Sequence, residues 1–135
     1  ISESGISADS VLLEVADHAG VAKAMQNMDA GIFIIKPAYS KIASAPTKLG
    51  EFLGCGVPCL GNANVGDIAD IIVGEKVGVV LSSFDADSIR VAVEELVCLT
   101  KQEGIQAHCR DVALRYFSLK EGVRSFDRIY RELVV

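Results

Sequence analysis

The sequence predicts an α/β fold, in which a doubly wound parallel sheet carries further helices at its C-terminal end. Segments with the apolar runs of strands alternate with segments of helical periodicity along most of the chain. The run from Gly31 to Ile35 is almost continuously apolar, which is typical of a parallel strand that helices cover on both faces. Half of the 135 residues are apolar and 23% are charged, so we expect a single domain over residues 1–135 around one core.

Two strands and two helices are expected in the first half of the chain. The mostly apolar segments Ser10 to Val15 and Ala30 to Ile35 predict a short strand and a buried strand. Ala19 to Met28 predicts a helix, because its apolar residues recur at helical spacing. Pro46 presets the backbone of a first helical turn, so a second helix is expected from Pro46 to Gly54.

The second half predicts two more strands, for about four in all, and four more helices. The strands are Pro58 to Gly61 and Val77 to Leu81. The helices run from Asp67, as N-cap, to Val73, from a cap at Asp85, from Ile105 to Tyr116, and from a capping box of Ser118 and Glu121 to the last residues. The expected core-facing stripes are Ile89, Val93, Leu96 and Val97 after Asp85, and Val123, Phe126, Ile129, Tyr130 and Leu133 in the last helix.

Composition and charge exclude several classes of function. The net charge of −5 has no run of Lys or Arg to follow a phosphate backbone, so nucleic acid is not an expected partner. No apolar run approaches the roughly 18 residues of a membrane span. Cys55, Cys59, Cys98 and Cys109 lack paired C-x-x-C spacing, which favours core thiols in a reducing cytoplasm over a metal site.

The helix expected after Pro46 has the features of an anion-binding site. In parallel sheets ligands bind beyond the carboxyl ends of the strands, and the loop after Ile35 leads to this helix. The amides of Thr47, Lys48 and Leu49 are expected to point out of the helix end, where the macrodipole favours negative charge. Helical spacing places Thr47, Lys48 and Glu51 on one face, away from the core.

A nucleoside diphosphate requires these groups together. Amides and a cation bind the diphosphate, and a carboxylate accepts hydrogen bonds from the ribose hydroxyls. The same residues are equally compatible with an ordinary helix that carries an exposed pair between Lys48 and Glu51.

Four phrases between Met28 and Asp67 are distinctive. They read Met28-Asp29-Ala30-Gly31-Ile32-Phe33, Ser44-Ala45-Pro46-Thr47-Lys48-Leu49-Gly50-Glu51-Phe52-Leu53, Cys55-Gly56-Val57-Pro58 and Val65-Gly66-Asp67. These phrases resemble the C-terminal, donor-binding domain of the family 4 (group 1) GT-B glycosyltransferases. The stretch from Pro46 to Pro58 is the most specific part, and a weaker resemblance runs from about Asp17 to the final helix.

The resemblance implies a site for a nucleotide-diphospho-sugar donor, with no cofactor and no metal. In that family the carboxylate that matches Glu51 binds the ribose. The start of the helix holds the diphosphate, which assigns Ser44, Pro46, Thr47, Lys48 and Leu49 to the donor site. His18 matches the segment that contacts the base, although an ordinary turn histidine fits as well.

The chain departs from the family pattern at one position. The family has a second Glu eight residues before the matching carboxylate, where it contacts the sugar, but this chain has Ala43 there. The sugar is therefore not identified. The family's Arg and Lys at the start of this domain and its catalytic residue in the N-terminal domain have no counterpart here, so we expect a fragment that is inactive without its N-terminal partner domain.

Two functions follow from these observations. The first is donor binding as the C-terminal half of a glycosyltransferase that acts on an unknown acceptor. The second is a non-catalytic, doubly wound α/β module that binds a protein or a small ligand, which the fold alone would explain equally well.

Overall fold

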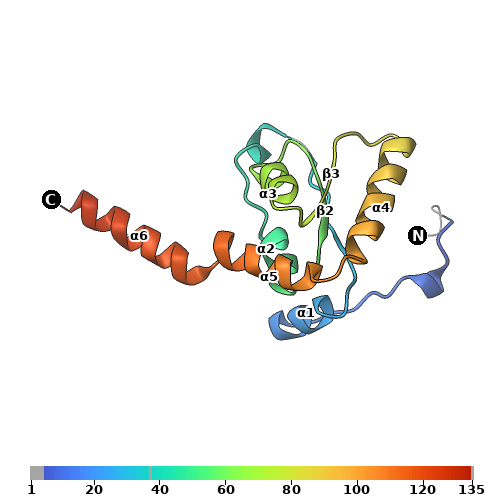
Figure 1. The fold of residues 1–135 in the computed structure, drawn as a ribbon, viewed down its shortest axis with the longest axis horizontal. Coiled ribbons are helices and arrows are strands. Elements are labelled where there is room, and N and C mark those ends of the chain that lie inside the picture. The colour runs from blue at the N-terminus through green and yellow to red at the C-terminus, as the bar shows by residue number, and fades with distance from the viewer. Residues whose placement is uncertain (1–4, 37, 135) are drawn as a thin grey trace.

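A three-stranded parallel sheet organises the chain, as seen in a computed structural model that describes residues 5–36 and 38–134 (Figure 1). Its strands are β1 (Gly31–Ile32), β2 (Cys59–Asn62) and β3 (Gly78–Leu81), in that spatial order. Gly31 lies opposite Cys59, and Leu60 lies opposite Val79. The expected parallel pairing of the segments that contain β1 and β2 is confirmed.

Helices lie on both faces of this sheet (Figure 1). The larger core cluster joins the sheet to α2, α3 and α5, and it buries Phe33 and Leu53 as expected. The smaller cluster joins the sheet to α4 through Leu60, Leu81 and Leu96. The bounds of the helices are α1 (His18–Met25), α2 (Thr47–Gly54), α3 (Ile68–Gly74), α4 (Ala86–Thr100), α5 (Ile105–Tyr116) and α6 (Leu119–Leu133), with 3-10 turns at Ala8–Ser10 and Tyr39–Lys41.

The prediction of a strand from Ser10 to Val15 is wrong. Residues 8–10 form a 3-10 turn instead, and Leu12, Leu13 and Val15 are almost fully exposed. A strand requires a neighbour along its edge, and none of the described strands pairs with this segment. The described sheet therefore has three strands and not about four.

The expectation that Ala30 to Ile35 is buried on both faces is also wrong. Strand pairing covers only Gly31 and Ile32, and β1 lies at an edge of the described sheet. Phe33 packs into the larger cluster, whereas Ile32 and Ile34 are 60% and 49% exposed. These two side chains line an apolar pocket of about 180 Å³ together with Ile89 and Val93 of α4, so the packing of α4 against β1 is incomplete.

The helices differ from expectation mainly in which side they bury. In α4 the buried residues are Ala92, Leu96 and Leu99, so of the expected stripe only Leu96 is buried. Ile89, Val93 and Val97 remain exposed, as does Cys98, which was expected in the core. Cys59 and Cys109 are core thiols, and burial raises the pKa of Cys109 to about 11.

Two helix ends and one stripe also need correction. Helix α1 ends at Met25, three residues early, and the side chain of Asp67 makes no cap hydrogen bond among the described residues. Asp85 caps α4 as expected, through the amide of Ser88 at 2.9 Å. The apolar stripe of α6 is present in sequence but buries no residue, because α6 extends away from the sheet (Figure 1). None of the described helices combines the length and apolar character needed to cross a membrane.

Candidate functional site

Helix α2 begins at Thr47, one residue later than expected, and Pro46 is its N-cap in an extended conformation and not the first residue of the helix. Pro46 has φ −66° and no amide hydrogen, so it forms the N-cap without leaving a donor unpaired. The amides of Thr47 and Lys48 have no acceptor among the described residues. The amide of Leu49 was expected to be free as well, but it donates to the carbonyl of Pro46 at 3.2 Å because the first turn is tight. Two free amides thus remain at this helix end.

The loop before α2 is held by the turn that follows β2. Gly66 donates its amide to the carbonyl of Lys41 at 3.3 Å, with φ +49°. A Cβ at Gly66 would lie 1.9 Å from the carbonyl oxygen of Ser44, so glycine permits the close approach of these two segments. The hydroxyl of Ser44 donates to the carbonyl of Ser40 at 3.5 Å within the same loop. Ser44 therefore acts in this structure as part of the support for the helix start.

Asn62 continues the pairing of β1 with β2 beyond the last residue of β1. Its Oδ1 accepts from the amide of Ile35 at 2.8 Å, and its Nδ2 donates to the carbonyl of Ile35 at 2.9 Å. The side chain is 2% exposed, and its polar atoms are satisfied, since Nδ2 also donates to the carbonyl of Ala63. Asn62 thereby fixes the point from which the loop to α2 departs. Sequence reasoning missed it, although a polar residue that ends an apolar strand was a visible signal.

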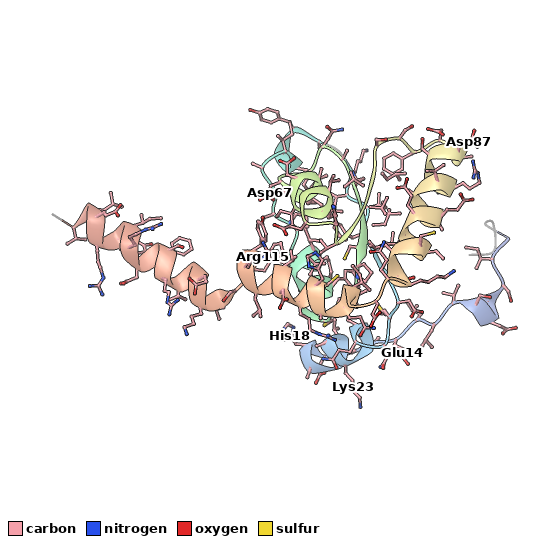
Figure 2. All side chains as sticks on the ribbon, viewed as in Figure 1. Glu14, His18, Lys23, Asp67, Asp87 and Arg115 are labelled. Atoms are coloured by element: carbon pink, nitrogen blue, oxygen red, sulfur yellow. The ribbon has the colours of Figure 1, made fainter. Side chains whose placement is uncertain are left out.

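A cavity of about 230 Å³ lies between α1 and α2. His18, Lys48 and Glu51 line it together, so the structure brings these three expected site residues to one place. Figure 2 shows His18 at the start of α1. The remaining wall consists of Val21, Ala22, Met25 and Cys55. The three α1 residues among these are part of the apolar spacing that predicts a helix in this segment. Met25 is buried in the larger core cluster and Val21 packs against it, so the core contact of these two is confirmed while they also form the cavity wall.

The other expected site residues lie outside this cavity, at the start of α2. Ser44, Pro46 and Thr47 belong to the loop and the first turn, and they are not among its lining residues. The side chain of Leu49 is 1% exposed in the core, so only its backbone faces the helix start. The candidate site therefore has two parts, a helix end with two free amides and a cavity along the same helix.

Lys48 and Glu51 contact each other directly. Their side chains are 52% and 36% exposed, and Lys48 Nζ lies 2.6 Å from Glu51 Oε2. An exposed pair at this helical spacing contributes only about 0.2–0.5 kcal/mol, because water screens both charges. An anion or a hydroxyl group can therefore replace one partner at small cost. The contact between Lys48 and Glu51 is therefore compatible with both alternatives that the sequence left open, an exposed ion pair and a pair that binds a ligand.

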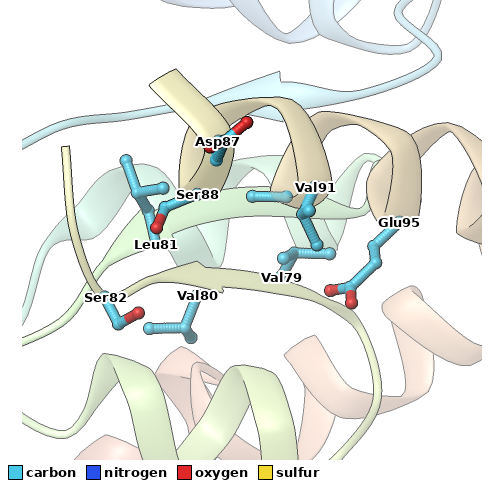
Figure 3. Close-up of a pocket in the computed structure, with 9 residues that line it drawn as sticks. Val79, Val80, Leu81, Ser82, Asp87, Ser88, Val91 and Glu95 are labelled. Carbon is cyan, nitrogen blue, oxygen red and sulfur yellow. The ribbon is translucent and has the colours of Figure 1, made fainter. Parts of the chain in front are cut away.

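Two larger grooves lie elsewhere, between β3 and α4. They measure about 390 Å³ and 570 Å³, and Figure 3 shows residues of the first. Their charged lining residues are Asp87, Glu94, Glu95 and Lys76. This excess of carboxylates disfavours a diphosphate, so the smaller cavity beside α2 remains the candidate site for an anionic ligand.

Metal coordination has no visible basis in the described part of the chain. No three His, Cys, Asp or Glu side chains there are grouped to hold an ion. No family model, curated protein sequence or solved structure matches the chain.

Proposed function

We propose that the chain is the donor-binding, C-terminal half of a GT-B glycosyltransferase of family 4 (group 1) type. On this proposal the three-stranded sheet is part of a doubly wound, Rossmann-like sheet, and an N-terminal domain of the same protein supplies the acceptor side. The observation that carries the proposal is the grouping of His18, Lys48 and Glu51 in one cavity along α2, whose first amides are free.

Each part of a nucleoside diphosphate has a matching group in this arrangement. The amides of Thr47 and Lys48 and the ammonium of Lys48 attract the diphosphate. The carboxylate of Glu51 accepts from ribose hydroxyls, and the apolar wall with His18 receives the base.

The contribution of this domain to catalysis would be electrostatic. When the glycosidic bond to the donor breaks, negative charge develops on the departing diphosphate. Fixed amide dipoles and a cation stabilise that charge without reorganisation. The acceptor base and the remaining catalytic groups belong to the other side of the cleft, so the chain alone should bind donor and not turn it over.

A thermal-shift panel with UDP, GDP, ADP and dTDP tests donor binding by this chain. A ligand that binds only the folded state stabilises it, by about 2.7 kcal/mol at a concentration of 100 times its Kd. We expect at least one of the four to raise the Tm. If none of them raises the Tm at millimolar concentration, the alternative of a non-catalytic binding module is favoured.

Replacing Glu51 by Gln tests whether the binding uses the proposed carboxylate. Hydrogen bonds to a charged acceptor contribute about 1.5–3 kcal/mol, so Glu51→Gln should lower the affinity for the active nucleotide by roughly ten- to a hundredfold. Glu94→Gln is the matched control, because Glu94 is also an exposed helical carboxylate, paired with Arg90 at 3.0 Å. Equal affinities of both variants and the wild type in an isothermal titration would leave Glu51 as a surface residue.

A further inference from the structure

The outer edge of β3 is open along its whole length. β3 lies at the end of the described sheet, and only β2 pairs with it. Cys59 donates to the carbonyl of Val77, and Ala63 donates to the carbonyl of Leu81, so alternate residues of β3 face β2. The amides and carbonyls of Gly78 and Val80 therefore point outward.

Nothing in β3 blocks the addition of another strand. Natural edge strands are usually protected by Lys, Pro or a bulge, but β3 reads Gly-Val-Val-Leu and pairs in regular register. The two grooves described above share Val79, Val80, Val91 and Glu95, so they form one channel along this edge. The channel has apolar walls on both sides of the open backbone, from Val91 of α4 and from Val73 of α3.

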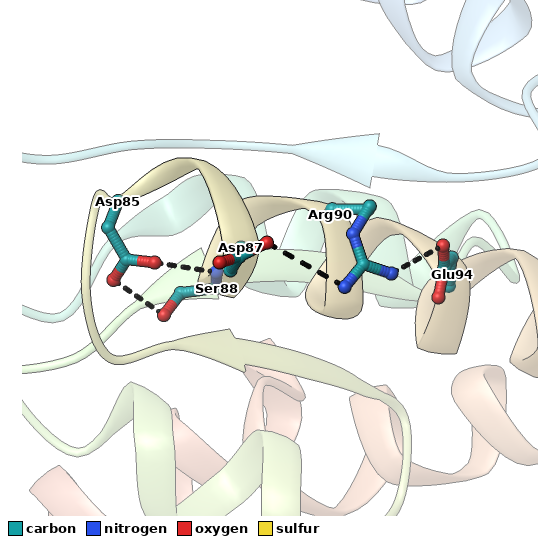
Figure 4. Close-up of polar contacts among 5 residues, drawn as sticks. All are labelled: Asp85, Asp87, Ser88, Arg90 and Glu94. Atoms are coloured by element: carbon teal, nitrogen blue, oxygen red, sulfur yellow. Dashed lines mark hydrogen bonds and ion pairs between the residues drawn. The ribbon is translucent and has the colours of Figure 1, made fainter.

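The charge of the channel indicates what it accepts. Glu95 lies over β3 in Figure 3 and forms no ion pair within the described residues. Asp87 stands about two helical turns earlier, and its contact with Arg90 is long, at 3.8 Å (Figure 4). Arg90 approaches Glu94 more closely, and Lys76 is the one cation among the described residues that line the channel.

We propose that the open edge of β3 binds an extended, positively charged peptide segment of another protein, which adds to the sheet as a further strand. Backbone hydrogen bonds to Gly78 and Val80 would provide affinity, as in other cases of strand addition. Asp87 and Glu95 are eight residues apart on α4, which is about 12 Å along its axis. Four residues of a strand span a similar ~13 Å, so basic side chains at positions i and i+4 of the peptide face both carboxylates.

A second copy of the chain fits the same edge less well. Pairing β3 with β3 across a two-fold axis would bring the same surface of both copies together. The unpaired Glu95 side chains of both copies would then lie on one joined channel that is already acidic, and like charges there oppose association. A basic partner meets no such repulsion.

The test uses the whole chain and synthetic hexapeptides, with binding followed by NMR of the backbone amides. The probe is acetyl-Lys-Val-Lys-Val-Lys-Val-amide. Two further peptides carry N-methyl groups, one on the three Lys amides and the other on the three Val amides. In an added strand only one of these sets faces β3. We expect one methylated peptide to lose binding at least tenfold and the other to bind like the probe, with shifts centred on Gly78, Val80 and Ser82.

The charge is tested separately with Glu95→Lys. Its matched control is Glu132→Lys, which makes the same charge change at an exposed position of α6. We expect Glu95→Lys to lower the affinity for the probe at least tenfold and Glu132→Lys to leave it nearly unchanged. Equal binding of both methylated peptides, equal affinities of the two charge variants, absence of binding at 1 mM probe, or dimerisation of the chain through β3 would each overturn the proposal.

Discussion

The side chain of Asn62 forms the hydrogen bonds with the backbone of Ile35 that a paired strand residue would otherwise form. The amide and the carbonyl of Ile35 both form hydrogen bonds with the side chain of Asn62. Ile35 lies beyond the last residue of β1 that pairs with β2. Asn62 is 2% exposed and the two bonds are partly buried, so loss of this side chain would leave the amide and carbonyl of Ile35 without a partner where access to water is limited. One side chain thus couples the stability of the sheet to the position of the loop before α2.

Asn62→Ala should destabilise the chain by about 1–3 kcal/mol, because it leaves partly buried polar groups of Ile35 without partners. The free energy of unfolding in urea measures this loss. Asn27→Ala is the control, since the side chain of Asn27 makes an exposed bond to the carbonyl of Lys23, and its removal should cost less than about 0.5 kcal/mol. Similar losses in both variants would contradict the role assigned to Asn62.

Glu75 joins the end of α3 to α5. Its carboxylate accepts from Arg115 at 2.6 Å and from the hydroxyl of Tyr116 at 2.6 Å, and these two bonds lower its pKa. Figure 2 shows Arg115 on α5. Since the pKa is lower in the folded chain than in the unfolded one, the stabilisation is fully present above the ordinary carboxyl pKa and is lost as the pH falls through the lowered value.

The difference in stability between wild type and Glu75→Gln should therefore depend on pH. We expect a constant difference from neutral pH down to about pH 5, and a decreasing difference below the ordinary Glu pKa of about 4.3. Urea unfolding midpoints from pH 7 to pH 3 provide the measurement. Arg115→Gln removes the same pair from its other side, so the double variant should lose less than the sum of both single changes. A pH-independent difference would mean that the bonds do not favour the charged form.

At the scale of elements, the helices were more predictable than the sheet. The periodicity that predicts α2, α4 and α5 is local, because each helix forms its hydrogen bonds within a few residues. The pairing of a strand depends on distant residues, so the apolar segment from Ser10 to Val15 predicted a strand that has no neighbour among the described strands.

In the candidate site, too, the local features were predictable from the sequence and the long-range contacts were not. Helical spacing placed Lys48 and Glu51 on one exposed face, and the structure has them in contact. The approach of α1 to α2, which forms the cavity with His18, is a tertiary contact that spacing alone could not predict. The bond from the Cys55 thiol to the carbonyl of Ala22, at 3.7 Å, belongs to that contact.

Gly66→Ala tests how the turn after β2 supports the start of α2. The added Cβ would lie 1.9 Å from the carbonyl oxygen of Ser44, and the φ of +49° is itself unfavourable for alanine. We expect a loss of about 1–3 kcal/mol in unfolding free energy and weaker binding of the active nucleotide. Gly54→Ala is the control, because its Cβ meets nothing within 4 Å and alanine favours the helix. Unchanged stability and binding in Gly66→Ala would show that the loop adapts freely.

At the scale of the whole molecule, the chain consists of a body around the sheet and a projecting helix (Figure 1). Neither core cluster extends beyond α5, and α6 contributes no buried residue to either. Its apolar side chains are nevertheless arranged on one face, as the sequence predicts, and Phe126 stacks on Tyr130 with ring centroids 6.5 Å apart. The amphipathic pattern of a helix thus indicates which side can be buried, and the tertiary contacts decide whether it is.

Phe126→Ser should leave the unfolding free energy of the chain nearly unchanged, because α6 projects from the body and buries no residue. Phe126 is 64% exposed, so a polar side chain removes little buried apolar surface. We expect a change of less than about 0.5 kcal/mol in the unfolding free energy, as for other surface substitutions. Leu53→Ala provides the contrast, because Leu53 is 0% exposed within the larger cluster and its truncation should cost about 2–5 kcal/mol. Urea denaturation followed by far-UV circular dichroism compares the two. A loss in Phe126→Ser that approaches the loss in Leu53→Ala would mean that α6 packs against the body in solution, and the division into body and projecting helix would then be wrong.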